Sequence, residues 1–358
     1  MAAARKTPLI AVSMGDPAGI GPEVILKAAT ALARRRERPT IVVVGDLGAM
    51  CAAADRLGKS CVKPCEWRPD DGTPPGRGGL AVINLGRLPA KAIAPARPSI
   101  AGADAAYRYI VEGARMAMAG EAGALVTAPI NKEWLNRAGH RFPGHSELLA
   151  RLGQVRTWRM MFAGGDLRLA LVTVHMGLAR VSRALTRDGV YQTIRLLAEH
   201  LRGPAGIAHP RIAVLGFNPH AGENGLFGDE EIKTIVPAIA RARRAGIDAT
   251  GPGAPDTAFI RRNGAFAFDA AVAMYHDQGL IALKTLEFDR AVNVTLGLPF
   301  IRTSPDHGTA YDIAGRGTAS AASMIAAIEY AARAARARIA PARHAAGGAV
   351  AGVRGDPR

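Results

Sequence analysis

The sequence predicts an α/β protein built on a mostly parallel sheet with helices on both faces. Short β-branched segments alternate with longer helical patterns over most of the 358 residues, and 49% of the residues are hydrophobic. The strand segments are nearly continuous apolar runs. Parallel strands that are covered on both faces have this character, because neither side meets water. The apolar content also excludes a mainly disordered chain.

The elements follow a regular order along the chain. We expect strands at residues 8–14, 40–45, 80–85, 124–127, 168–174, 211–216, 270–275 and 292–296. We expect helices at residues 22–35, 104–119, 187–201 and 229–245. The Pro- and Gly-dense stretch 66–102 is expected to be a long surface excursion, and the Ala/Gly/Pro/Arg-rich stretch 339–358 a disordered basic tail.

Composition argues against nucleic-acid and membrane partners. The formal net charge is +16, but only eight of the 46 basic residues are lysine, so the excess follows an arginine- and alanine-rich composition. No nucleic-acid-binding motif accompanies it. No segment approaches ~18 apolar residues without a charge or a proline. Residues 1–14 lack a cleavage-site pattern and fit a first strand, which predicts a cytoplasmic protein. Cys51, Cys61 and Cys65 have no histidine nearby and predict small thiols in a reducing compartment.

The first glycine-rich segment follows the first predicted strand. Gly15–Glu23 reads GDPAGIGPE and leads into the helix expected at 22–35. Its glycines permit a tight turn, and proline suits the first helical position. The dinucleotide pattern G-x-G-x-x-G is absent, because Val24 stands three positions after Gly21. A plain tight turn and a ligand-binding turn therefore both remain open.

Three histidines each follow a predicted strand. His175 ends the segment LVTVH, His220 follows LGFNP, and His276 follows AMY. In a parallel sheet these positions converge on one edge, where three imidazoles can hold a divalent metal and leave positions open for substrate. Any one of them alone is more often structural. Imidazole ligands favour a zinc-like ion, but the sequence does not fix the metal.

Further polar residues fit a small anionic substrate. His145 and Ser146 precede a short helical run, where a hydroxyl and free amides form either an anion site or an ordinary Ser N-cap. Lys284, Asn293 and Arg302 recur every nine residues, and together they suit a molecule carrying carboxylate and phosphate. The stretch Asp306–Gly317 contains a Gly-bearing turn expected to open a helix and receive an adenine nucleotide.

These segments together resemble a known enzyme family. GDPAGIGPE (15–23), TAPINK (127–132), GHSELLA (144–150), NPHAGE (218–223), YHDQG (275–279) and the stretch 292–317 are similar to motifs of the 4-hydroxythreonine-4-phosphate dehydrogenases of pyridoxine biosynthesis. The first and last segments also resemble isocitrate and isopropylmalate dehydrogenases, which bind nicotinamide cofactors without the Rossmann glycine pattern. Ser146 stands where the family usually has threonine, so the hydroxyl is kept.

The resemblance implies two α/β/α domains with the active site in the cleft between them. We expect residues 1–130 with 300–338 in one domain and 131–299 in the other. The family is homodimeric, with each active site completed by the partner chain. Its pattern assigns His175, His220 and His276 as metal ligands; His145, Ser146, Lys284, Asn293 and Arg302 as substrate-binding residues; Lys284 as catalytic; and His307, Gly308 and Thr309 as cofactor-binding.

The implied reaction is NAD- or NADP-dependent oxidation of a phosphorylated substrate. One divalent metal per site (zinc, magnesium or cobalt) would acidify the C3 hydroxyl of 4-hydroxy-L-threonine 4-phosphate. Hydride transfer then gives a β-keto acid that loses CO₂ and yields 3-amino-2-oxopropyl phosphate. The nearest alternative is oxidation of threonate or erythronate 4-phosphate. A dihydrodiol dehydrogenase fits less well, because His145 and Arg302 suit a phosphate. A metal-dependent hydrolase or a nucleic-acid-binding protein is the alternative from another class.

Overall fold

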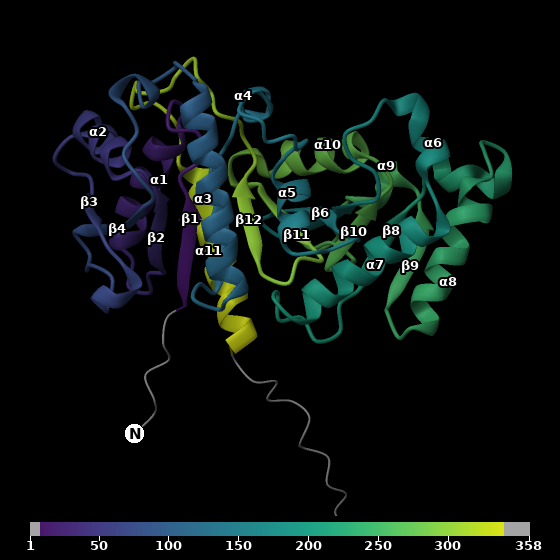
Figure 1. Ribbon diagram of the computed structural model, residues 1–358. Helices are drawn as coiled ribbons and strands as arrows, with labels where there is room; N and C mark the ends of the chain where they lie inside the picture. Colours follow the sequence, from purple (N-terminus) through teal and green to yellow (C-terminus); the bar gives the residue numbers. More distant parts are fainter. Residues whose placement is uncertain (1–7, 340–358) are drawn as a thin grey trace, which may run out of the picture.

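One continuous sheet runs through the molecule (Figure 1). The structure, a computed structural model, describes residues 8–339. Within them the strands lie in the order β3-β4-β2-β1-β5-β12-β11-β6-β7-β10-β8-β9. Their bounds are β1 Leu9–Ser13, β2 Thr40–Gly45, β3 Lys63–Glu66, β4 Gly79–Asn84, β5 Ala124–Thr127, β6 Arg159–Gly164, β7 Leu167–Leu171, β8 Ile212–Leu215, β9 Ala249–Gly253, β10 Ala270–Ala273, β11 Val292–Leu296 and β12 Arg302–Pro305.

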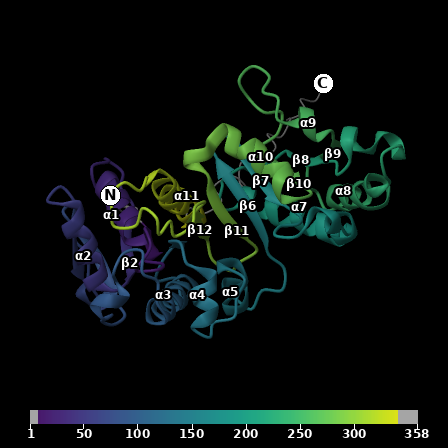
Figure 2. The same ribbon diagram turned by 90° about the horizontal axis from the view of Figure 1, so that it is seen from above.

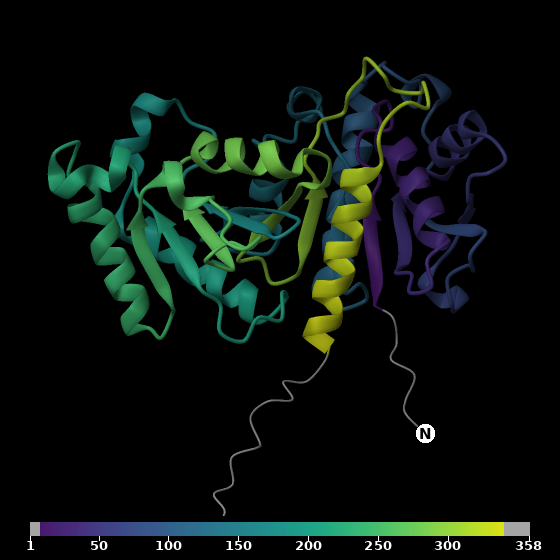
Figure 3. The ribbon, with the colours of Figure 1, turned by 180° about the vertical axis from the view of Figure 1, so that it is seen from behind.

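Helices cover both faces of this sheet. The α-helices are α1 Gly21–Ala33, α2 Leu47–Leu57, α3 Ile100–Met118, α4 Lys132–Arg137, α5 His145–Leu152, α6 Val181–Ala184, α7 Arg187–Arg202, α8 Val236–Arg244, α9 Pro255–Ala258, α10 His276–Glu287 and α11 Ala322–Ile339. Figure 2 shows α3, α4 and α5 on one side of the central strands and α10 and α11 on the other. Figure 3 shows α11 lying across the face opposite α3.

The sheet is parallel in both halves and antiparallel at its centre. β1 pairs in parallel with β2 and β5, and β10 pairs in parallel with β7 and β8. Between these halves, β11 runs antiparallel to both β12 and β6. The apolar strands form the core: Val12 and Val272, one in each half, are fully buried. The fold class predicted from the sequence is therefore confirmed.

All eight predicted strands form, and four more were not predicted. The unpredicted strands are β3, β6, β9 and β12. The stretch 66–102 is less of a surface excursion than expected, because it contains β4 and the buried Trp67. The helix expected at 229–245 begins as a π-helical turn, Glu231–Ile235, before α8.

The structure does not test two of the predictions made from the sequence. The predicted basic tail lies outside the described residues, apart from Ile339, which ends α11. The division of the chain into two domains stays a prediction, since the strands of both proposed units join in one sheet. Among the helices at residues 8–339, none is long and apolar enough to cross a membrane.

Candidate active site

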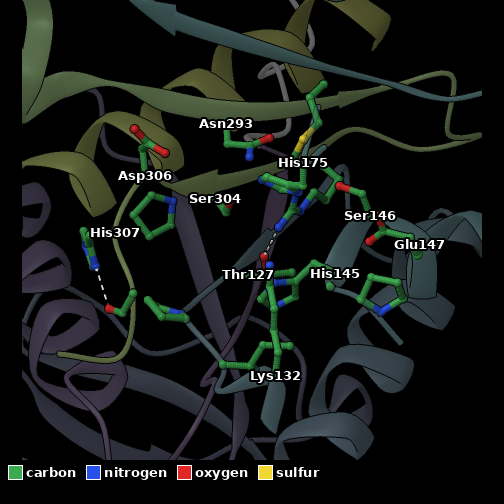
Figure 4. Close-up of a pocket in the computed structure, with 18 of the residues that line it drawn as sticks. Thr127, Lys132, His145, Ser146, Glu147, His175, Asn293, Ser304, Asp306 and His307 are labelled. Carbon is green, nitrogen blue, oxygen red and sulfur yellow. Dashed lines mark hydrogen bonds between the residues drawn. The ribbon is translucent and has the colours of Figure 1, made fainter. Parts of the chain in front are cut away.

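A cavity of about 360 Å³ opens where the centre of the sheet meets α4 and α5 (Figure 4). Strands β5, β6, β11 and β12 contribute side chains to it, as do the loops after β7 and β12 and the first residue of α10. Its polar lining is Thr127, Lys132, His145, Ser146, Glu147, His175, His276, Asn293, Arg302, Ser304, Asp306 and His307. Residues far apart in the sequence thus surround one space large enough for a small substrate.

Arg302 is a buried cation at the wall of this cavity. It is 2% exposed, and burial lowers its pKa to about 9. Its Nη1 donates to Thr295 Oγ1 at 3.0 Å and its Nη2 to Thr127 Oγ1 at 2.7 Å. Within the described chain, its Nε has no hydrogen-bond partner. A buried guanidinium bonded only to neutral hydroxyls favours the binding of an anion.

His145 and Ser146 lie beside Arg302. Burial, with the nearby charges of Arg302 and Lys132, lowers the pKa of His145 well below its usual value, so its imidazole is neutral. The Ser146 hydroxyl lies 3.2 Å from Thr295 Oγ1, which links it to Arg302. Ser146 does not cap the helix, because Gly144 occupies the N-cap of α5 and Ser146 lies in the first turn. The sequence-based N-cap interpretation was wrong for this reason.

Several buried polar atoms around the cavity lack partners within residues 8–339. They are His145 Nε2, Asn293 Oδ1, Arg302 Nε and His307 Nε2. All four residues line the cavity. Buried polar groups are normally satisfied, so such a concentration in one place indicates groups that a ligand would satisfy.

Lys284 lies at the border of the cavity rather than in its wall. Its Nζ lies 2.8 Å from Asp306 Oδ2, and Asp306 is a lining residue. The expectation that Lys284, Asn293 and Arg302 face one cleft thus fits Asn293 and Arg302 directly. Lys284 reaches the site through its ion pair.

The structure brings together two of the three predicted metal-binding histidines. His175 and His276 both line the cavity, with ring centroids 5.8 Å apart. Burial and nearby Lys132 lower the pKa of His175, so it is neutral and able to bind a metal. His220 is exposed on the loop after β8 and does not line the cavity. No group of three His, Cys, Asp or Glu side chains within the described chain is arranged to hold a metal.

The strands that precede the three histidines, β7, β8 and β10, nevertheless run in parallel as predicted. His220 departs because the segment Pro219–Gly225 turns through left-handed conformations and carries the imidazole outward, 6.3 Å from the Phe227 ring. Two imidazoles suit a zinc-like ion chemically, but residues 8–339 of the same chain bring no third ligand to them.

The predicted cofactor segment borders the cavity in part. His307 and Gly308 line it, and a Cβ on Gly308 would meet no atom within 4 Å, so the backbone is open to a ligand. Thr309 does not line the cavity, and its carbonyl oxygen accepts the Ile20 N–H at 3.0 Å. Residues 306–317 form turns, and the helix expected there begins only at Ala322.

The first glycine-rich segment supports this loop. Asp16 is 2% exposed and accepts a hydrogen bond from Tyr311 Oη at 2.5 Å, and burial raises the pKa of the Asp16 carboxyl. Gly15 has φ +73°, and a Cβ there would lie 2.4 Å from the Pro129 carbonyl oxygen. The segment is thus a buried turn that packs the loops 127–132 and 306–317 together.

Residue-based reasoning missed several lining side chains. Lys132 and Thr127 belong to TAPINK, and Glu147 belongs to GHSELLA, but no role was assigned to them. For Thr127 and Lys132 the available signal was their position at and just after the end of β5, because binding residues gather at strand ends in α/β folds. Figure 4 shows Asp306 and His307 at one end of the cavity and Ser146 and Glu147 at the other.

The chain is similar to known proteins over nearly its whole length. A family model described as "Pyridoxal phosphate biosynthetic protein PdxA" matches residues 37–331. A 4-hydroxythreonine-4-phosphate dehydrogenase from Geobacter metallireducens is 49% identical over 334 residues, covering 92% of this chain and 96% of the relative. A crystal structure of the same-named enzyme from Klebsiella pneumoniae superposes with a TM-score of 0.84 at 40% identity, covering 93% of this chain and 100% of that one.

One relative carries a different name. A protein from Bradyrhizobium diazoefficiens, provisionally named a D-threonate 4-phosphate dehydrogenase, is 45% identical over 341 residues, covering 90% of this chain and 96% of the relative. The family match spans far more than half of the chain, and these identities extend over nine-tenths of it. The chain belongs to the PdxA family of pyridoxal phosphate biosynthetic proteins.

Proposed function

We propose that this chain oxidises 4-hydroxy-L-threonine 4-phosphate at C3 with NAD or NADP, giving a β-keto acid that loses CO₂. The observation that carries the proposal is Arg302, a buried guanidinium whose hydrogen bonds within the described chain go only to two threonine hydroxyls. Membership of a dehydrogenase family supports the nicotinamide cofactor. The product would be 3-amino-2-oxopropyl phosphate.

The anionic groups of the substrate would bind among the basic and hydroxyl groups of the cavity. Arg302 offers Nε and can exchange its threonine hydroxyls for phosphate or carboxylate oxygens, which form stronger charge-assisted bonds. The neutral His145 imidazole lies beside it with Nε2 unpartnered in the described chain, and Ser146 adds a hydroxyl that can donate a hydrogen bond. Lys132 adds a positive charge at the cavity, where it already lowers the pKa of both His145 and His175.

Asn293 and Lys284 would act nearer the reacting carbon. The Asn293 side-chain oxygen is buried without a partner in the described chain and suits a hydroxyl or ammonium donor on the substrate. Lys284, ion-paired with Asp306 at 2.8 Å, carries a charge suited to an enolate oxygen as it develops during loss of CO₂. We propose Lys284 as the catalytic residue on this basis.

A nicotinamide and a divalent ion complete the proposed site. When bound, the nicotinamide would accept hydride from C3 and the ion would acidify the C3 hydroxyl. His307 and Gly308, which border the cavity, are the residues proposed to contact the cofactor, with Thr309 shaping the loop. His175 and His276 would supply two imidazole ligands to zinc, cobalt or magnesium, of which the first two fit nitrogen donors better.

The third imidazole would come from a second copy of the chain. His220 is exposed, and large apolar side chains surround its loop: Leu226 is 73% exposed and Phe227 48%. Ile232, on the adjoining turn, is 52% exposed. Exposed apolar groups in this number favour a protein interface. We therefore propose a homodimer in which His220 of one chain completes the metal site of the other.

A sugar-acid phosphate is the second candidate substrate. Threonate and erythronate 4-phosphate share the phosphate, the carboxylate and the C3 hydroxyl, and they carry a C2 hydroxyl in place of the amino group. The name of the Bradyrhizobium relative favours this alternative. The two substrates would use the same cavity and the same chemistry.

Steady-state kinetics on both substrates test the proposal. Metal-loaded protein is mixed with 4-hydroxy-L-threonine 4-phosphate or D-threonate 4-phosphate and either cofactor, and reduced cofactor is followed by absorbance. Turnover on the amino acid is expected. Preference for the sugar acid would reassign the substrate, and no reduction of either cofactor would reject the proposal.

A further inference from the structure

The loop that carries His220 has an unusual backbone. His220, Ala221, Gly222, Glu223 and Asn224 all have positive φ, between 44° and 81°. Residues other than glycine rarely adopt this region, and such a conformation persists only where the surroundings impose it. The loop therefore needs a support that selects this conformation over an ordinary turn.

Glu231 supplies that support. Its side chain is 3% exposed, and Oε1 accepts the backbone N–H groups of Phe217 at 2.7 Å and Asn218 at 2.8 Å. Its Oε2 accepts from Asn218 Nδ2 at 2.9 Å. A Cβ added to Gly222 would lie 2.6 Å from this same oxygen. The carboxylate thus binds the chain just before the loop and packs against the middle of the loop.

A second carboxylate fixes the same asparagine. Glu230 accepts from Asn218 Nδ2 at 2.7 Å and from Ser182 Oγ at 2.6 Å. Glu231 is also the first residue of a π-helical turn. Such turns are frequent at functional sites, because they direct a side chain that a regular helix would place differently.

The start of the loop is also hydrogen-bonded, through Gln278, to the chain on either side of His276. Gln278 donates from Nε2 to the Gly216 carbonyl oxygen at 2.7 Å and accepts from the Met274 N–H at 2.7 Å. Met274 precedes His276 by two residues, and Gly216 precedes the residues held by Glu231. The strand end that leads to His276 and the one that leads to His220 therefore form one hydrogen-bonded unit.

We propose that Glu231 is a positioning residue, which holds residues 219–225 in the left-handed conformation and so directs His220 toward the metal site of a second copy. The proposal rests on the proposed function, since it requires His220 to be a metal ligand. Glu231 itself does not line the cavity and is given no contact with substrate or metal.

Cobalt binding to the full-length protein tests this role directly. Co²⁺ is titrated into metal-free protein and followed by calorimetry and by its visible absorption. Glu231→Ala should weaken Co²⁺ binding by about 10- to 100-fold, the usual effect of removing a group that orients a ligand. Glu231→Gln keeps an oxygen that can accept both backbone N–H groups, so its affinity should stay within about threefold of wild type. Activity of Glu231→Ala should recover at high Co²⁺.

Two further variants guard against a purely structural effect. Asp46 is a matched control: it is 1% exposed and accepts two backbone N–H groups, from Ala49 and Leu88, each at 2.7 Å. Asp46→Ala should lower thermal stability but leave Co²⁺ affinity unchanged. Gly222→Ala disturbs the same contact from the loop side, and it decides the question if Glu231→Ala does not fold.

The outcomes separate this inference from the proposed function. Wild-type Co²⁺ affinity in folded Glu231→Ala and Gly222→Ala, with loss of affinity in His220→Ala, would overturn the positioning role alone. Wild-type affinity in His220→Ala would instead reject His220 as a ligand. Weakened binding in all three, with Asp46→Ala unaffected, is the expected result.

Discussion

Replacing Arg302 by methionine should raise stability while removing substrate binding. In the unliganded protein, burial lowers the pKa of Arg302 from 12.5 to about 9, which corresponds to about 5 kcal/mol against the charged form. This penalty is present in full below pH 9 and is relieved only as pH rises toward 12.5. Methionine removes it but deprives two threonine hydroxyls of their donors, at about 1 kcal/mol each.

The net expectation is a gain of about 2 to 3 kcal/mol in the free energy of unfolding. It is measured by urea unfolding at pH 7.5 without phosphate or sulfate, because either anion would stabilise the wild-type protein. The KM for the phosphorylated substrate should rise at least about 100-fold, since charge-assisted hydrogen bonds contribute about 1.5 to 3 kcal/mol each.

Arg159 provides a matched control. It is partly buried, but it donates to Thr193 Oγ1 at 2.8 Å, the Trp158 carbonyl oxygen at 2.7 Å and the Gly189 carbonyl oxygen at 3.3 Å, and it does not line the cavity. Arg159→Met should lower stability and leave KM unchanged. The reasoning is refuted if Arg302→Met behaves in the same way as this control.

Three further predictions concern pH, metal and assembly. Burial lowers the pKa of His200 to about 4. As the pH falls from 6.5 toward 4, the unfolded state therefore binds a proton that the folded state does not, and the free energy of unfolding should decrease. In urea unfolding, His200→Gln should reduce this dependence of the free energy of unfolding on pH. Chelation should abolish activity and Co²⁺ should restore it, while calorimetry should show weaker Co²⁺ binding by His175→Ala; full activity of metal-free protein would contradict the metal role. Phe227→Glu should convert a dimer to inactive monomers by light scattering, and an active monomer would contradict the shared site.

Most strands were predictable because buried strands consist largely of apolar residues. Runs such as Thr40–Gly45 and Ala124–Thr127 are apolar except for one threonine each, and both strands lie between neighbours on both sides. β12 was missed because its residues are Arg302, Thr303, Ser304 and Pro305, all buried. Arg302 and Ser304 line the cavity, so this central strand is polar in part because it serves the site, which sequence periodicity does not reveal.

The site was predictable in its chemistry more than in its geometry. Parallel pairing of β7, β10 and β8 follows from the strand pattern, and it correctly predicted that His175 and His276 lie together. The position of His220 depends instead on a left-handed loop held by Glu231, which lies 16 residues after the end of β8 at Leu215. No local pattern specifies such a contact. Lys132 and Glu147 were missed because a charged residue near a helix start is usually a solvated one.

The most direct test of the account is the substrate comparison under identical conditions. Purified metal-loaded protein is given 4-hydroxy-L-threonine 4-phosphate or D-threonate 4-phosphate with each nicotinamide cofactor, and reduced cofactor and released CO₂ are measured together. The account predicts equal amounts of both products from the amino acid and much slower turnover of the sugar acid. Reduced cofactor without CO₂, or faster turnover of D-threonate 4-phosphate, would contradict it.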